Sequence, residues 1–270
     1  MPQLVPIDDP TDPRIAAYRD VRERDLVGRE GHFIAEGEVV LRMLIRSPRH
    51  AAQHRAVSLL LAEKRVAGLM PLLEELPEGV PVYTAGQAVL DAIAGFPLHR
   101  GILALGRREP LPPAGDLLGR LRPRALVVAL FGIGNHDNMG GIFRNAAAFG
   151  VDAVLLDPTC CDPLYRKAIR VSVGAALLLP TARLEGDAVE LFARHGFTPL
   201  ALSPAGETTL AGLKRPDRAA VLLGSEGPGL PADLLARART VRIPMAGGFD
   251  SLNVATTSGI VLHHLACGEG

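Results

Sequence analysis

The second half of the chain alternates continuous apolar runs with stretches of helical periodicity, and this alternation restricts the fold more than any other feature. Runs that lack a polar alternation are typical of strands buried on both faces. The pattern therefore predicts an α/β fold, a parallel sheet covered by helices on both faces. Strands are expected at 125–131, 153–156, 176–179, 198–202, 219–223 and 240–243, and helices at 141–149, 163–171, 187–195, 231–238 and 252–265.

The first half carries a weaker pattern of short helices and strands. Four prolines and two glycines between Glu109 and Arg124 separate the halves, because proline interrupts both helices and ladders. We expect a small α/β domain at 1–110, a Pro-rich linker at 111–123 and the larger α/β domain at 124–270. In the first domain, strands are expected at 33–35, 56–62, 81–84 and 101–105, and helices at 14–26, 39–45, 69–76 and 87–93.

Composition excludes several classes of protein. No apolar run is long enough to cross a bilayer, and the first residues lack the basic start and apolar core of a secretion signal, so a cytoplasmic location is expected. The three cysteines, Cys160, Cys161 and Cys267, and the eight histidines form no zinc or disulfide pattern, and no metal is expected. A net charge of zero argues against strong non-specific binding to nucleic acid.

Ligands of open parallel sheets bind beyond the carboxyl ends of the strands, and three loops there have unusual compositions. The first loop, 132–138, begins as Gly-x-Gly and suggests a dinucleotide site. The third glycine is missing, since Asp137 stands there, and Asp157 is a poor ribose ligand before a proline, so that fingerprint fails. Asn138 instead stands where its side chain can cap a helix, and Arg144, six residues later, is within reach of the loop.

The other two loops each leave a structural alternative open. At 223–229 the sequence Leu-Gly-Ser-Glu-Gly-Pro-Gly presents Glu226 between glycines, which allow a ligand close to the backbone; the alternative is an ordinary Gly-Pro turn. The third loop, 243–255, is Gly-rich and leads into the last predicted helix. Ser251 and Asn253 lie at its end, and the alternative is that either is only the helix N-cap.

Taken together, the three loops resemble the motifs of the SpoU (TrmH-type) RNA 2′-O-ribose methyltransferases of the SPOUT superfamily. The resemblance covers 124–270. The first domain, through 31–37, is more loosely similar to the family's substrate-binding domain, which has a ribosomal-protein-like RNA-binding fold. The matching segments are Asn-Met-Gly-Gly-Ile-Phe-Arg at 138–144, Leu-Gly-Ser-Glu-Gly at 223–227, Ile-Pro-Met at 243–245, Ser-Leu-Asn-Val at 251–254, and the stretches 165–168 and 173–175.

This resemblance implies a deep trefoil knot, S-adenosylmethionine as the cofactor and a homodimer whose site combines residues of two chains. It also implies RNA as the substrate, with ribosomal RNA favoured over transfer RNA. The implied catalytic residues are Arg144, Asn138, Glu226, Ser251 and Asn253. The implied cofactor-binding residues are Leu223, Gly224, Gly227, Ile243, Met245 and Leu252.

By the same resemblance Arg144 acts on the ribose hydroxyl, a poor nucleophile that loses its proton near the transition state. Arginine stays protonated in proteins, so we expect it to stabilise the developing oxyanion while a substrate phosphate or water takes the proton. Asn138 is expected to orient Arg144 or the ribose. The alternatives are a transfer-RNA enzyme, a non-catalytic RNA-binding or ribosome-assembly protein with a vestigial pocket, and a nucleotide-dependent oxidoreductase.

Overall fold

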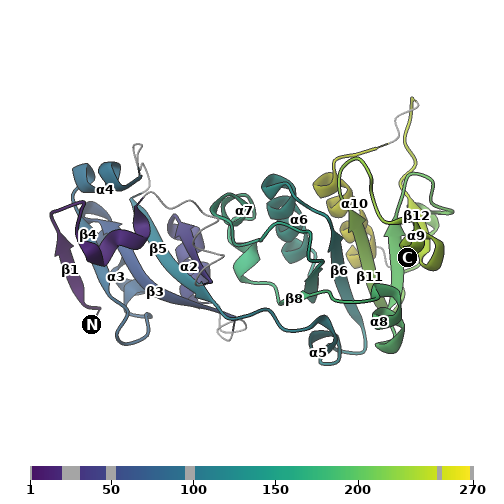
Figure 1. The fold of residues 1–270 in the computed structure, drawn as a ribbon, viewed down its shortest axis with the longest axis horizontal. Coiled ribbons are helices and arrows are strands. Elements are labelled where there is room, and N and C mark those ends of the chain that lie inside the picture. The colour runs from purple at the N-terminus through teal and green to yellow at the C-terminus, as the bar shows by residue number, and fades with distance from the viewer. Residues whose placement is uncertain (1, 20–30, 47–52, 95–100, 248–250, 268–270) are drawn as a thin grey trace. The chain divides into compact units, whose positions relative to one another are not determined.

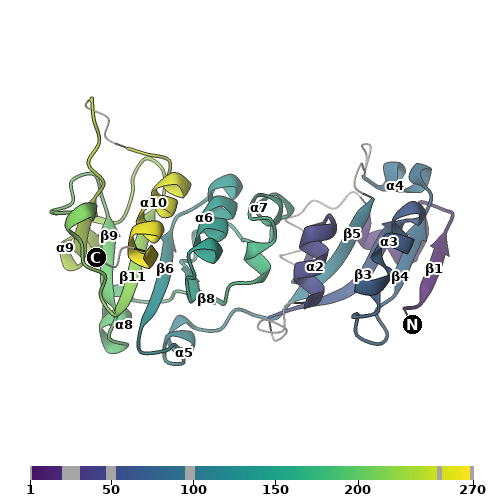
Figure 2. The ribbon, with the colours of Figure 1, turned by 180° about the vertical axis from the view of Figure 1, so that it is seen from behind.

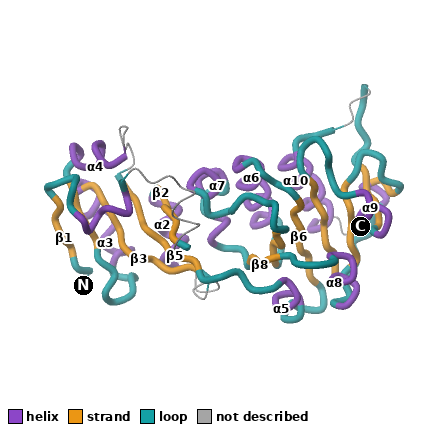
Figure 3. The backbone as a smooth tube through the Cα atoms, viewed as in Figure 1, coloured by secondary structure: helices purple, strands orange, loops and turns teal. Residues whose placement is uncertain are grey.

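The computed structural model describes residues 2–19, 31–46, 53–94, 101–247 and 251–267, and they form two compact units (Figure 1). Unit 1 comprises Met1–Pro110 and Leu164–Leu178, and unit 2 comprises Leu111–Pro163 and Leu179–Gly270. Each unit contains one sheet with helices around it, as the strands in Figure 3 show. No helix of the described residues is long and apolar enough to span a membrane.

Unit 1 is built on a mixed five-stranded sheet in the order β1-β4-β3-β5-β2. β1, β4 and β3 run parallel, whereas β5 is antiparallel to both β3 and β2. The strands are β1 (Leu4–Ile7), β2 (His32–Glu36), β3 (His54–Ala62), β4 (Val82–Ala85) and β5 (Ile102–Arg108).

Helices cover both faces of this sheet because its central strands are apolar on both faces. On one face, Ile15 and Tyr18 of the 3-10 helix η1 (Pro13–Tyr18) and Leu90 of α4 (Gln87–Ala94) pack on Leu60 and Leu103. On the other lie α2 (Glu38–Arg46) and α3 (Glu63–Leu73), which Figure 2 shows in front of the strands.

Unit 2 has a seven-stranded, entirely parallel sheet in the order β10-β12-β9-β11-β6-β7-β8. This confirms the predicted α/β fold with a parallel sheet. The strands are β6 (Ala125–Phe131), β7 (Ala153–Leu156), β8 (Thr181–Arg183), β9 (Thr198–Leu202), β10 (Thr208–Thr209), β11 (Arg218–Gly224) and β12 (Arg239–Arg242).

Helices cover both faces of this sheet, as predicted, although one of them, α5 (Ala114–Leu118), was not expected. α5, α8 (Ala188–Arg194) and α9 (Ala232–Arg237) share a buried apolar cluster with one face. On the other, α6 (His136–Ala148) and α10 (Val254–Cys267) lie side by side (Figures 1 and 2). A Cβ atom at Gly141 of α6 would lie 2.8 Å from Ala255 Cβ of α10, so this glycine permits the close approach of the two helices.

Residues 111–123, expected to be a linker, instead belong to unit 2. They contain α5, whose Leu118 is completely buried. Arg218 fixes the end of this helix, because its guanidinium donates to the carbonyl oxygens of Leu118, Leu121 and Arg122 at 2.8–3.2 Å and lies 4.3 Å from the ring centroid of Phe197. Prolines flank the helix, but tertiary packing makes it an ordered part of the domain.

The segment 164–178 also departs from the expected boundaries. It lies between β7 and β8 in the chain but belongs to unit 1, and it contains α7 (Arg166–Val171) and the 3-10 helix η3 (Ala175–Leu177). Arg166 of α7 donates to Glu36 Oε2 of β2 at 2.8 and 3.0 Å.

Two elements of the sequence analysis need correction. The strand expected at 176–179 is wrong: the chain forms η3 there, after Gly174 takes a φ of +82°, and the strand begins only at Thr181. A short apolar run alone does not distinguish a strand from a buried helical turn. The helix expected at 14–26 is a 3-10 helix from Pro13 to Tyr18, and positions 20–26 lie outside the described residues.

Candidate active site

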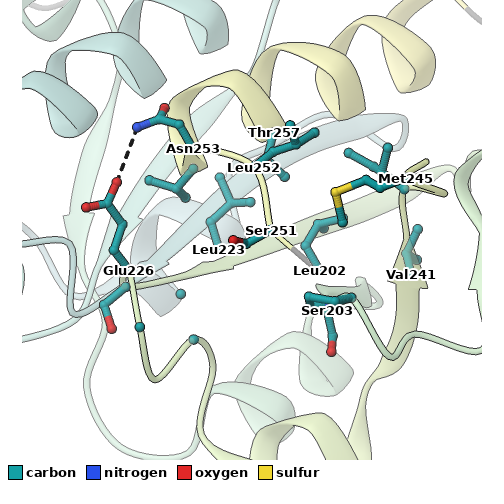
Figure 4. A pocket seen from close by; sticks show the side chains of 17 residues that line it. Leu202, Ser203, Leu223, Glu226, Val241, Met245, Ser251, Leu252, Asn253 and Thr257 are labelled. Carbon is teal, nitrogen blue, oxygen red and sulfur yellow. Dashed lines mark hydrogen bonds between the residues drawn. The ribbon is translucent and has the colours of Figure 1, made fainter. Parts of the chain in front are cut away.

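A cavity of about 410 Å³ lies at the carboxyl ends of β9, β11 and β12 (Figure 4). This is the edge at which parallel sheets bind ligands. The second and third predicted loops line the cavity, and β9 contributes a further wall. Its apolar surface includes Leu202, Leu223, Val241, Met245 and Leu252. Glu226 is the only charged side chain among the described lining residues.

The loop after β11 is a tight backbone hairpin. Ser225 and Gly229 form a bridge, with Gly229 N donating to Ser225 O at 3.1 Å. Gly227 has a φ of +88°, a value that residues other than glycine rarely adopt. At Gly224 a Cβ would lie 2.3 Å from Gly229 C. The two alternatives for this loop, an ordinary Gly-Pro turn and a loop that presents Glu226, therefore describe the same structure. The turn leaves Glu226 exposed, as predicted.

Asn138 lies in the first turn of α6 but does not cap this helix, contrary to the sequence interpretation. α6 starts at His136, and its N-cap is Asn135, whose side chain accepts from the amides of Asp137 and Asn138. The Asn138 side chain is therefore available for other contacts. It is buried, with an exposure of 6%, and its Nδ2 donates to Glu226 Oε1 at 2.8 Å.

Asn253 joins this pair and also caps α10. Its Oδ1 accepts from the backbone amides of Ala255 and Thr256 at 2.9 and 3.2 Å, which is the N-cap geometry. Its Nδ2 donates to Asn138 Oδ1 at 2.8 Å and to Glu226 Oε1 at 3.2 Å, the dashed line in Figure 4. We call Asn138, Glu226 and Asn253 the amide–carboxylate cluster. The N-cap alternative is thus correct for Asn253, but it describes only one of the residue's two roles.

The remaining predicted catalytic residues, Ser251 and Arg144, differ in position. Ser251 lines the cavity; positions 248–250 just before it lie outside the described residues. Arg144 does not line the cavity. It is exposed on α6 and has no hydrogen bond or ion pair within the part of the chain that the structure describes. Six residues turn a helix about 600°, so Arg144 and Asn138 lie on different faces of α6, and Asn138 does not orient Arg144 within this chain.

All six predicted cofactor-binding positions line the cavity. Sequence reasoning missed its β9 wall, Ser203 and Pro204. Because β9 lies next to β11 in the sheet, the carboxyl-end rule points to these residues once the strand order is known. The six positions are Leu223, Gly224, Gly227, Ile243, Met245 and Leu252.

The first loop has no dinucleotide geometry. Asp157, the acidic residue considered for a ribose, instead accepts from Gly132 N at 3.2 Å and from Thr159 N at 2.9 Å, so it holds two loops together.

Burial raises the pKa of the Cys160 thiol to about 12 and that of Cys161 to about 11, and both thiols are therefore protonated at neutral pH. Among the described residues no group of histidine, cysteine and acidic side chains is placed to hold a metal ion.

Comparisons with a family model and with known protein sequences both point to RNA methyltransferases. The model of the SpoU rRNA methylase family matches residues 125–263. An uncharacterised tRNA/rRNA methyltransferase of Mycobacterium bovis is 39% identical over 267 residues, which cover 94% of this chain and 89% of that protein.

Solved structures share the fold across both units. The AdoMet-bound rRNA methyltransferase of Sinorhizobium meliloti superposes with a TM-score of 0.80 at 23% identity and covers 98% of each chain. The SpoU methyltransferase AviRb of Streptomyces viridochromogenes, in complex with AdoMet, superposes with a TM-score of 0.76 at 20% identity, covering 93% of this chain and 95% of that one.

Proposed function

Since the chain belongs to the SpoU family of RNA methyltransferases, which use S-adenosylmethionine as cofactor, we propose that it methylates a ribose 2′-hydroxyl of ribosomal RNA. One observation carries this proposal. The amide–carboxylate cluster lies at the rim of an apolar cavity, and it joins three loops that are far apart in the chain.

The cavity suits the cofactor in size and charge. Its volume of about 410 Å³ is within the range of small-molecule sites, and its apolar side chains suit an adenosine. The carboxylate of Glu226, the one charged side chain among the described lining residues, disfavours the anionic pyrophosphate of a dinucleotide. A single carboxylate, Glu226, favours a cationic ligand instead. This charge pattern argues against the oxidoreductase alternative.

S-adenosylmethionine bound there supplies a methyl group on a sulfonium, whose departure as a neutral thioether requires no proton. The chain must then orient the acceptor and stabilise its charge. Asn138 and Asn253 both donate to Glu226 Oε1, which fixes the direction of that carboxylate. We assign Arg144 to the developing ribose oxyanion, because a protonated guanidinium stabilises negative charge without taking the proton.

A second copy of the chain completes this site in our proposal. Arg144 is exposed and does not line the cavity of its own chain, so a homodimer provides a way to bring it to a partner's cavity. We further propose that unit 1 binds the substrate RNA with a ribosomal-protein-like fold, and that the loops of unit 2 form a trefoil knot.

The test is transfer of labelled methyl groups from S-adenosylmethionine to RNA transcribed in vitro, followed by digestion to nucleosides. We expect the label in 2′-O-methylnucleosides of ribosomal RNA, because the 2′-hydroxyl is the group that distinguishes RNA from DNA. Label in the bases would refute ribose methylation, and label in transfer RNA alone would refute the ribosomal target. Binding of both S-adenosylmethionine and RNA without transfer would favour a non-catalytic protein.

Substitution of Asn253 separates its two roles. Asn253→Asp retains a good helix cap but replaces the donor to Glu226 with a second carboxylate. We expect stability close to wild type and a rate of methyl transfer at least about tenfold lower at pH 8. Two adjacent carboxylates raise each other's pKa, so the ratio of variant to wild-type rate should recover as the pH falls toward 6.

Rates measured from pH 6 to 8, together with urea unfolding, check this prediction. The matched variant Asn253→Ala loses the cap as well and should be destabilised by about 1 kcal/mol. A rate of Asn253→Asp equal to that of wild type at pH 8 would show that the donor to Glu226 is dispensable.

A further inference from the structure

Unit 1 contains a cavity of about 780 Å³ that the active site does not use. It lies where β2 turns into α2, and its walls also come from the start of α3 and from the segment 164–178. The charged residues that line it, together with Val173, are Glu36, Glu38, Lys64, Arg65 and Arg170.

The carboxylates of this cavity are already neutralised. Glu36 Oε2 accepts from Nε and Nη2 of Arg166 at 3.0 and 2.8 Å. Glu38 accepts from Arg42 at 2.6 Å and from Arg65 at 2.9 Å. The hydrogen bond from Arg42 keeps the pKa of Glu38 below its ordinary value, so this carboxylate stays ionised and paired.

Two cations of the cavity, Arg170 and Lys64, have no carboxylate partner among the residues that the structure describes. Arg170 is exposed and makes no ion pair or hydrogen bond within the described residues. Lys64 donates to the neutral amide oxygen of Gln87 at 3.1 Å, which leaves its charge uncompensated. The cavity therefore carries an excess of positive charge, and an anion is the ligand that this charge favours.

Arg65 adds a guanidinium that is held in place before any ligand arrives. Its Nη2 donates to Glu38 Oε2 at 2.9 Å, and the side chain lines the cavity and is 41% exposed. Its Nε is buried and has no hydrogen-bond partner among the described residues, so the exposed part of the guanidinium is the part that can meet an anion.

The wall that carries Arg170 is held in a strained conformation. Val173 has a φ of +54° and is the only non-glycine residue of the described chain with a positive φ, which is a marked outlier for a β-branched residue. Gly174 follows at +82°, and a Cβ there would lie 2.6 Å from Met43 Sδ of α2. The turn is thus pressed against α2. Strain of this kind persists where the surroundings impose it and is common at ligand sites.

We propose that this cavity binds a phosphodiester of the substrate RNA, with Arg170 and Lys64 as its cationic contacts and the exposed part of the Arg65 guanidinium as a third donor. The inference rests on the proposed function, which makes RNA the polyanion that this chain holds. The cavity is larger than one phosphate requires, and Val39 at its edge is 51% exposed, which offers an apolar surface to the adjoining sugar or base.

Neutral substitutions test the phosphate contact. For Arg170→Gln and Lys64→Gln, we expect filter binding of ribosomal RNA transcribed in vitro to weaken about tenfold each. The slope of log affinity against log salt should become shallower by about one for each variant. A variant with one phosphate contact fewer releases fewer counterions from the RNA when it binds. Calorimetric titration with S-adenosylmethionine should give the wild-type affinity.

The matched control is Arg107→Gln. Arg107 is also exposed and carried by β5, but it lies five residues along that strand from Ile102, which lines the cavity, or roughly 17 Å away. Its salt slope should equal that of wild type. If Arg170→Gln and Lys64→Gln keep the affinity and slope of this control, the cavity is not a phosphate site, even when the wild-type protein methylates ribose. If both slopes fall while no methyl group is transferred, the phosphate site stands and the proposed reaction fails.

Discussion

Replacing Arg144 with alanine is expected to slow methyl transfer by about a hundredfold or more and to leave the affinity for S-adenosylmethionine unchanged. Arg144 is exposed and does not line the cofactor cavity, so its loss leaves no buried group without a partner. Stabilisation of an oxyanion operates in the transition state, so kcat should fall with little change in KM for RNA. Initial rates with ribosomal RNA and calorimetric titration of the cofactor check both parts.

Two further variants make this result specific to the guanidinium. Arg144→Lys keeps the positive charge but lacks the planar fork of donors, and an intermediate rate is expected. Arg194→Ala removes another exposed arginine of unit 2. Among the described residues, its side chain donates only to Glu190 O of the same helix, so the rate should not change. An Arg144→Ala protein that methylates at the wild-type rate would show that another group stabilises the ribose oxygen.

The sequence predicted the strands of unit 2 best where an apolar run is bounded by helical stretches. The strands at 125–131, 153–156 and 198–202 were predicted with their observed bounds, because continuous apolar runs between helical stretches have few other solutions. β8 was missed, since three residues, Thr-Ala-Arg, carry no apolar run. The apolar residues just before it form a 3-10 helix that packs in unit 1. This packing depends on contacts with residues far away in the sequence, which a local apolar pattern does not reveal.

The candidate site was predictable as a set of loops but not as a set of contacts. Glycines and polar residues at strand ends identified Asn138, Glu226 and Asn253 individually. Their hydrogen bonds connect positions 88 and 115 residues apart, and only the fold brings these together. Local rules also assigned the cap of α6 to Asn138, whereas Asn135 takes that role and leaves Asn138 for the cluster.

Gly224→Ala is expected to lower the affinity for S-adenosylmethionine at least about tenfold. The added Cβ would lie 2.3 Å from Gly229 C and 2.4 Å from Leu230 N. Both are backbone atoms, so the hairpin must open to accept it, and overpacking of this kind costs about 1–3 kcal/mol. Gly134→Ala is the matched control, because a Cβ there meets nothing within 4 Å. Calorimetric titration compares the two variants, and equal affinities would show that the hairpin adapts without cost to the cofactor site.

The Arg144 and Gly224 variants together test whether the site combines two chains. At a concentration of S-adenosylmethionine well below its dissociation constant, each variant alone should be slow, the first because it lacks the guanidinium and the second because its cavity binds the cofactor at least about tenfold more weakly. In a heterodimer with one copy of each, the intact cavity belongs to the chain that lacks Arg144, and the partner supplies the arginine. Purified heterodimers should therefore recover about half of the wild-type activity, since one of two equivalent sites is complete. Inactive heterodimers would place Arg144 in the site of its own chain, and a monomeric wild-type protein that methylates RNA would remove the need for a partner.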